Sequence, residues 1–115
     1  MLSRNLRLQG RGAFEAVFRK KKSIFANEIG LFFHSNGLPG SRIGFAFKQK
    51  AFPRAATRHF LKRKGSAIMR ELISELPKGV DVVILFHKPF LRPVEYKELK
   101  ASLRDLIKRL NKAKI

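Results

Sequence analysis

Residues 41–71 read SRIGFAFKQKAFPRAATRHFLKRKGSAIMRE, and this stretch decides the fold. Residues 42–49 alternate in the manner of a strand, whose successive side chains point to opposite faces of a sheet. One face carries Ile43, Phe45 and Phe47, and the other carries Arg42, Gly44, Ala46 and Lys48. Pro53 suits the start of a helix, because its missing N–H costs nothing there. The stretch therefore predicts a strand followed closely by a long helix.

The long helix is expected to cover residues 54–75. Its apolar stripe consists of Leu61, Ile68, Leu72 and Leu76, with Met69 and Ile73 beside it. Gly65 interrupts the helix, so we expect a bend or a close approach to another element at that position. Residues 77–79, Pro-Lys-Gly, end it.

Apolar periodicity predicts four more elements around this stretch. Residues 12–21 form a short helix, residues 28–34 a strand and residues 94–110 a last helix. Residues 80–87 are β-branched and nearly all apolar, as in a strand that is buried on both faces. The patterns alone give the order α, β, β, α, β, α. We therefore expect one domain, residues 1–115, with helices packed on one small sheet in an α+β sandwich.

The charge of the chain is far from balanced. Twenty-six Lys and Arg residues face eight acidic residues, so the formal net charge is +18, and the isoelectric point is about 11.4. Repulsion on this scale weakens a compact state unless a polyanion neutralises it. Nucleic acid is the commonest such partner, and a membrane surface is the second candidate.

Several other classes of protein are disfavoured by the sequence. No Cys is present, which excludes a disulfide framework and a thiolate metal site. The basic N-terminus is not followed by the apolar segment of a signal peptide. The longest apolar run, residues 80–86, includes Asp81 and is far shorter than the ~20 residues that span a bilayer. A soluble cytoplasmic protein that does not bind membranes is expected.

Basic residues follow one stripe of the predicted long helix. Arg54, Arg58 and Lys62 are spaced at i, i+4 and i+8, which places them on one face. The basic surface is widened by Arg63, Lys64 and Arg70. A solvated face is the ordinary explanation of such a run. No acidic residue occurs between residues 42 and 70, however, and this favours contact with phosphates.

Aromatic residues are the second feature that could serve a nucleic acid, since unpaired bases stack on exposed rings. The chain has eleven Phe and no Trp, so Phe must also supply much of the core. For any single Phe the core is the better interpretation. Phe32 and Phe33 are neighbours in a strand and point to opposite faces, so at least one of them can face a groove.

Catalysis by protein groups is not expected. His34, His59 and His87 lie on three different elements, and no metal-binding spacing such as HExxH occurs. The eight acidic residues form no pair suited to two-metal or acid–base chemistry. No Ser lies in a G-x-S-x-G motif. We predict neither catalytic residues nor a metal site in the protein.

Residues 41–71 resemble the signature of the bacterial ribonuclease P protein. In that family an Arg-hydrophobic-Gly strand leads through a Lys-rich turn into a helix that carries Arg-Asn-x-x-Lys-Arg. Residues 42–44 (Arg-Ile-Gly) and residues 58–63 (Arg-His-Phe-Leu-Lys-Arg) are the counterparts. Residues 14–18 are similar to the family's Phe-x-x-Val-Phe, and residues 78–83 to its Gly-x-Asp-hydrophobic strand. The resemblance covers almost the whole chain.

The chain departs from the family pattern within its most diagnostic helix. His59 stands where the family has Asn, and Gln49-Lys50 stands where it has Lys-Lys. Ser66 replaces an Arg, and Gly65 is unexpected. The effect of these residues on RNA contacts is left open by the sequence.

The resemblance implies a two-layer α+β sandwich with the order α-β-β-β-α-β-α, like the second domain of ribosomal protein S5. Its basic helix makes a left-handed βαβ crossover, against the usual right-handed rule. It also implies that an RNA subunit removes the 5′ leader of precursor tRNA by metal-dependent hydrolysis. The protein would bind that catalytic RNA and the leader as a monomer in a 1:1 ribonucleoprotein. Mg²⁺ is expected with the RNA subunit, and no cofactor with the protein alone.

Two sets of RNA-binding residues are predicted. The basic helix and its approach comprise Arg42, Lys48, Lys50, Arg54, Arg58, His59, Lys62, Arg63, Lys64 and Arg70. A leader-binding cleft between the first helix and the sheet comprises Phe14, Phe18, Phe33, Phe45 and Phe47, of which the first three match cleft aromatics of the family. Two alternatives stay open: a small ribosomal or other structured-RNA-binding protein without a role in tRNA processing, and a nuclease that works without RNA.

Overall fold

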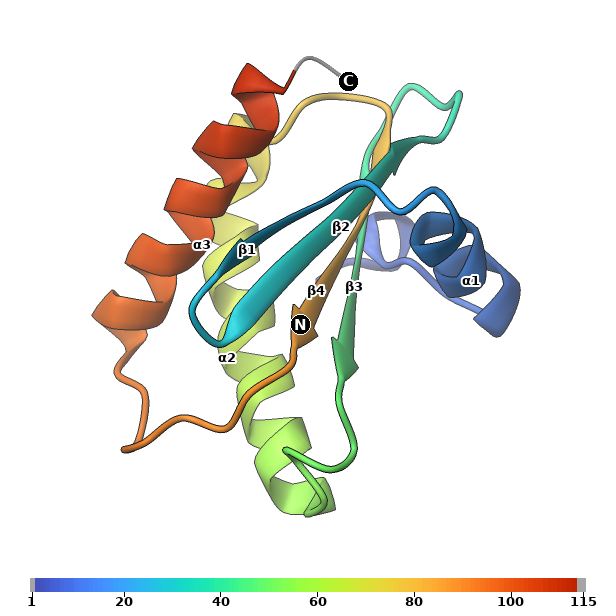
Figure 1. Ribbon diagram of the computed structural model, residues 1–115. Helices are drawn as coiled ribbons and strands as arrows, with labels where there is room; N and C mark the ends of the chain where they lie inside the picture. Colours follow the sequence, from blue (N-terminus) through green and yellow to red (C-terminus); the bar gives the residue numbers. More distant parts are fainter. Residues whose placement is uncertain (1, 114–115) are drawn as a thin grey trace.

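The computed structural model describes residues 2–113, which form a four-stranded sheet with helices on both faces (Figure 1). The helices are α1 (Arg11–Arg19), α2 (Ala55–Leu72) and α3 (Tyr96–Lys112), with short 3-10 turns at Arg4–Leu6 and Ile73–Glu75. The strands are β1 (Ser23–Ala26), β2 (Ile29–Ser35), β3 (Arg42–Phe47) and β4 (Val80–Phe86). The predicted α+β fold class and its α-β-β-β-α-β-α order are confirmed.

The strands lie in the order β1-β2-β4-β3. β1 and β2 form an antiparallel hairpin, β2 pairs antiparallel with β4, and β3 pairs parallel with β4. Helix α2 therefore connects two adjacent parallel strands, which is the crossover that the family resemblance implies. The N-terminal segment covers the outer edge of β3, where the Leu8 amide donates to the Ile43 carbonyl at 2.8 Å.

Strand β1 was absent from the elements predicted by apolar periodicity and was implied by the family resemblance alone. It has only four residues, and its side chains alternate between exposed and partly buried rather than between apolar and polar. Such a short edge strand gives no clear signal of its own. Its position depends on pairing with β2, where Phe25 lies opposite Gly30.

The larger core lies between the sheet and the pair of helices α2 and α3, which lie side by side on one face (Figure 1). Phe86 of β4 is fully buried there, and Phe47 stacks on it with ring centroids 5.0 Å apart. Gly65 of α2 allows this packing, because a Cβ at that position would lie 2.7 Å from the Phe45 ring. The close approach predicted at Gly65 is thus confirmed.

Helix α1 covers the opposite face of the sheet and forms a second, smaller core (Figure 1). Val17 packs against Leu8 and against Val83 of β4, and all three side chains are buried. Gly44 of β3 lies under the ring of Phe14, where a Cβ would come within 2.4 Å of that ring. One face of β3 therefore packs in the larger core and the other in the smaller core, as the alternation of its residues predicted.

A partly buried ion pair joins the first residue of β3 to the second residue of β4. Arg42 and Asp81 are partners in the parallel register, and two hydrogen bonds of 2.9 and 2.6 Å run from the guanidinium to the carboxylate. Asn36 donates a third at 2.8 Å, and His34 Nε2 lies 3.8 Å from Oδ2. Burial of Asp81 favours its neutral form, but the hydrogen bonds from Arg42 and Asn36 outweigh burial and lower the pKa of the carboxyl group.

Arg42 was predicted to contact RNA, and the structure gives it a different role. Its guanidinium makes the bidentate pair with Asp81, whose side chain is almost fully buried. The charge of Arg42 is thus paired within the fold, while 35% of its side chain stays exposed, so a contact with RNA remains a prediction. None of the helices within residues 2–113 is long and apolar enough to cross a membrane.

Candidate RNA-binding surfaces

Four aromatic side chains form a continuous row on the face of the sheet that α1 partly covers. We call this row the aromatic strip; its members are Phe18, Phe32, Phe25 and His87. Successive ring centroids are 4.9, 5.6 and 5.0 Å apart, and each pair meets edge to face. These distances are those of favourable aromatic contacts, so the rings hold one another in place.

The strip begins at α1 and runs across the β1–β2 hairpin. Phe18 of α1 packs on Phe32, which is partly buried in the smaller core. Phe25 of β1 lies beyond α1, and 44% of its surface is exposed. Gly30 makes room for it, because a Cβ there would lie 2.5 Å from the Phe25 ring. An apolar ring is thus presented to solvent on a rigid support.

Exposed lysines flank the strip. Lys20, Lys21 and Lys22 are consecutive and connect α1 to β1, and Lys48 and Lys88 follow the ends of β3 and β4. Rings between cations suit single-stranded RNA, since bases can stack while phosphates are neutralised nearby.

Three of the five predicted cleft aromatics lie on the wrong face for this surface. Phe33, Phe45 and Phe47 all point to the larger core, on the side of α2 and α3. Phe33 is only 5% exposed, and Phe45 lies against Gly65 of α2. Alternation within β2 gives the opposite face to Phe32, which takes the place predicted for Phe33.

Phe14 and Phe18 do lie between α1 and the sheet, as their spacing predicted. Phe18 belongs to the aromatic strip, whereas Phe14 sits over Gly44 and anchors α1. Phe25 and His87 were not predicted for this surface. Their proximity depends on strand order, so no local sequence signal could have identified them.

Helix α2 carries the second candidate surface. Its buried residues are Leu61, Gly65, Ser66, Ile68, Met69 and Leu72. The outward, exposed basic side chains are Arg54 at the N-cap, His59, Lys62, Arg63 and Arg70. Gly65 and Ser66, which depart from the family pattern, are buried against the sheet and do not lie on the cationic surface.

Two further predicted cations are partly engaged within the fold. Arg58 donates from Nη1 to the Phe52 carbonyl at 2.8 Å, and Lys64 donates from Nζ to the Val94 carbonyl at 2.9 Å. Both side chains keep further N–H donors for a ligand. Lys48 and Lys50 are exposed in the segment that leads from β3 into α2.

Acidic residues do not neutralise the exposed N-terminal part of α2. The first acid after residue 42 is Glu71, near the end of the helix. There it accepts hydrogen bonds from Tyr96 and Lys100 of α3, and these contacts lower the pKa of the Glu71 carboxyl group. The N-terminal half of α2 therefore presents uncompensated positive charge, which is the electrostatic requirement for binding phosphates.

A metal centre is not formed by the described part of the chain. Within residues 2–113, no three or more His, Cys, Asp or Glu side chains come together in a way that could hold a metal ion. The buried His34–Asp81 contact involves a single carboxylate that Arg42 already occupies.

Comparison with known proteins points to one family. A family model described as Ribonuclease P matches residues 2–111. A protein named Ribonuclease P protein component from Thermotoga maritima is 32% identical over 111 residues, which cover 94% of each chain. One of the same name from a Pseudanabaena species is 32% identical over 117 residues, covering 100% of this chain and 97% of that one.

Solved structures agree with these sequence matches. The RNase P protein from Thermotoga maritima superposes with a TM-score of 0.77 at 30% identity, covering 90% of this chain and 96% of that one. The Staphylococcus aureus RNase P protein gives a TM-score of 0.78 at 17% identity, covering 91% and 94%, which supports the fold alone. The matches do not favour the alternative of a small ribosomal protein.

Proposed function

The chain belongs to the Ribonuclease P family, and from that premise we propose that it binds the catalytic RNA of ribonuclease P through α2 and the 5′ leader of precursor tRNA along the aromatic strip. The observation that supports the leader site is the row of four rings that ends in half-exposed Phe25. The RNA-binding residues of α2 are Arg54, Arg58, His59, Lys62, Arg63, Lys64 and Arg70, approached through Lys48 and Lys50.

The two surfaces have separate tasks in this proposal. Folded RNA is recognised largely through its phosphates and shape, which a row of Arg and Lys side chains can read. A single-stranded leader exposes the faces of its bases, and these stack on rings such as Phe25 and Phe32. The protein thereby holds the substrate's leader beside the catalytic RNA, and the RNA subunit carries out the hydrolysis with Mg²⁺. We propose a single-domain monomer that acts in the cytoplasm in a 1:1 complex with the RNA.

Reconstitution with a bacterial ribonuclease P RNA at low magnesium tests this function. We expect cleavage of precursor tRNA at the mature 5′ end when protein and RNA are combined, and none with the protein alone. The reason is that the protein offers no catalytic carboxylates, while its cations can offset the repulsion between RNA subunit and substrate. Robust cleavage by the protein alone would show that it is a self-sufficient nuclease and contradict the proposal.

Replacing Phe25 with alanine should weaken binding of precursor tRNA to the holoenzyme about 5- to 100-fold, because a stacking contact contributes roughly 1–3 kcal/mol per base. Mature tRNA has no leader and should bind as before. Phe25 is half exposed, so the substitution should cost little folding stability. The ratio of the two dissociation constants is the measurement.

Leu38→Ala is the matched control for Phe25→Ala, since Leu38 is 47% exposed and lies in the β2–β3 loop, away from the strip. It should leave the precursor-to-mature ratio unchanged. If the precursor-to-mature ratio of dissociation constants were equal in Phe25→Ala, Leu38→Ala and the wild type, Phe25 would not belong to the leader site.

A further inference from the structure

A second aromatic surface lies on the other face of the sheet, between α2 and the loop that joins β4 to α3. It is a groove of about 440 Å³, which we call the Phe60 groove. One wall comes from the first half of α2 and the other from the loop. Its lining residues are Ala51, Phe52, Thr57, Phe60, Leu61, Pro89, Phe90, Leu91, Arg92, Pro93 and Val94.

The rim of the groove is apolar and exposed, whereas its floor is fixed. Phe60 is 48% exposed, and Leu91 is fully exposed. In the floor, Phe52 and Phe90 lie 6.3 Å apart, and both rings contact the fully buried Phe86. An exposed ring on a rigid floor is what a flat apolar ligand requires, because little conformational freedom is lost on binding.

Positive charge is built into the wall of the groove. Lys64 Nζ lies 4.5 Å from the centroid of the Phe60 ring, within the range of a cation–π contact. The same Nζ donates to the Val94 carbonyl on the opposite wall, so the ammonium group bridges the two sides. Arg63 is exposed on α2 one turn after Phe60, whereas Lys62 lines a separate hollow with Phe14 and Ser66.

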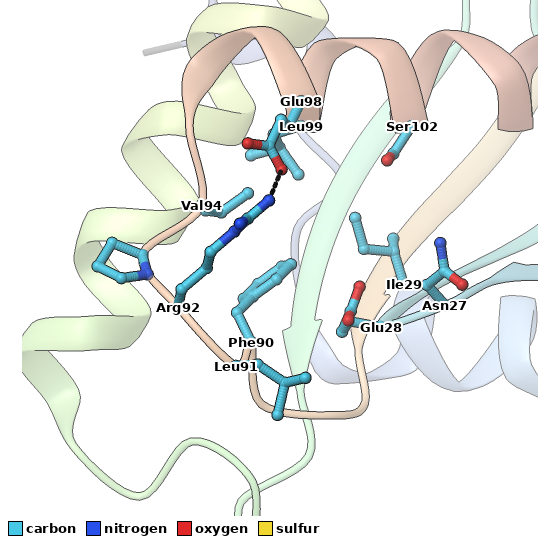
Figure 2. Close-up of a pocket in the computed structure, with 11 residues that line it drawn as sticks. Asn27, Glu28, Ile29, Phe90, Leu91, Arg92, Val94, Glu98, Leu99 and Ser102 are labelled. Atoms are coloured by element: carbon cyan, nitrogen blue, oxygen red, sulfur yellow. Dashed lines mark ion pairs between the residues drawn. The ribbon is translucent and has the colours of Figure 1, made fainter.

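The groove is distinguished from its neighbour by its lack of acids. An adjacent cavity of about 490 Å³ shares the loop residues Phe90 to Val94, but it is also lined by Glu28 and Glu98 (Figure 2). Arg92 pairs there with Glu98 at 3.8 Å. The residues that line the Phe60 groove include no carboxylate. Of the two hollows, only the Phe60 groove has the charge to accept part of a polyanion.

We propose that the Phe60 groove binds an unstacked nucleobase of the catalytic RNA, with the base on the ring of Phe60 beside Leu91. The phosphates on either side of that base would contact Arg63 and Lys64. This inference rests on the proposed function and adds a base contact to a helix that otherwise offers only charges. A second copy of the chain is a poorer occupant, because it would bring another net charge of +18 against the same cationic helix.

Affinity for a bacterial ribonuclease P RNA tests the groove. We expect Phe60→Ala to weaken binding about 5- to 100-fold, Phe60→Leu to recover part of the loss and Phe60→Tyr to recover nearly all of it, since only Tyr restores a ring. The slope of log K against log salt should stay that of the wild type, because no phosphate contact is lost. Lys62→Ala, by contrast, should flatten that slope by roughly one. Leu38→Ala, matched in exposure at 47%, should bind as the wild type does.

A fluorescence measurement reports on stacking directly, since the chain has no Trp of its own. In a Phe60→Trp variant the indole should be quenched when the ribonuclease P RNA binds, because a stacked base is in contact with it. Leu38→Trp should be little affected under the same conditions.

Three outcomes would overturn the inference. If the wild type binds the RNA while Phe60→Ala matches Leu38→Ala, the groove holds no base and the proposed function still stands. If Phe60→Ala instead abolishes a dimer of the free protein in sedimentation equilibrium, the groove belongs to a second copy. If the wild type does not bind the RNA at all, the inference falls together with the proposed function.

Discussion

Replacing Phe33 with alanine should lower the free energy of unfolding by about 3–5 kcal/mol, the usual loss for a buried Phe. Phe33 is 5% exposed and packs in the larger core, so the substitution leaves a cavity under α2 and α3. Chemical denaturation followed by circular dichroism measures the loss. The fraction of protein that remains folded should keep the wild-type ratio of precursor-to-mature tRNA affinities, because Phe33 does not face the leader site.

Phe32→Ala is the natural comparison, since Phe32 is the adjacent residue and belongs to the aromatic strip. It should change the affinity ratio more than Phe33→Ala and cost less stability, because Phe32 is only partly buried. If Phe33→Ala lowered the ratio and left stability intact, the assignment of the two faces of β2 would be reversed.

Replacing Arg42 with methionine is the second change with a large expected effect. It removes the main partner of Asp81, whose side chain is only 3% exposed, and leaves the buried carboxylate without a charged partner that pairs with it directly, held by Asn36 alone. Breaking a fully buried ion pair typically costs about 3–5 kcal/mol of stability, and because Arg42 is 35% exposed we expect a loss at the lower end of that range. The salt dependence of RNA binding by the folded variant should match the wild type, since this guanidinium is already neutralised.

The stability lost in the Arg42→Met variant should depend on pH. In the wild type the pKa of Asp81 is lowered, so its contribution to stability is complete above the unfolded-state pKa of about 3.9 and is lost as the pH falls through the folded-state value. In Arg42→Met, burial should instead raise the pKa of Asp81, so protonation relieves the penalty. The difference in unfolding free energy between the two proteins should therefore narrow from pH 7 toward pH 3. A constant difference over this range would mean that the ion pair is not its source.

The Arg42–Asp81 pair could not be predicted from the sequence. Arg42 and Asp81 are 39 residues apart, and only the parallel register of β3 and β4 makes them partners. From composition alone, one more Arg in a chain of net charge +18 is most simply assigned to RNA. The register gives it a structural role instead.

The role of Gly65 and Ser66 in the basic helix could not be predicted from the sequence either. The sequence marked them as departures from the family pattern, and their effect on RNA contacts was open. Both are buried, and Gly65 lies against Phe45 of the sheet. They serve the packing of α2, while His59, the remaining departure in that helix, is exposed on its cationic side.

The sequence by itself determined the fold class, most of the element boundaries and the cationic helix, because helical and strand periodicity and charge are local properties of the chain. It also placed Phe32 and Phe33 on opposite faces of β2. Only the tertiary structure decided which face looks toward α1, and thus which rings form the aromatic strip. The strip joins side chains of α1, β1, β2 and the residue after β4, and the Phe60 groove joins α2 to a loop about 30 residues away. Both depend on strand order and on the sides that the helices take, which are set by burial of the whole chain rather than by any one segment.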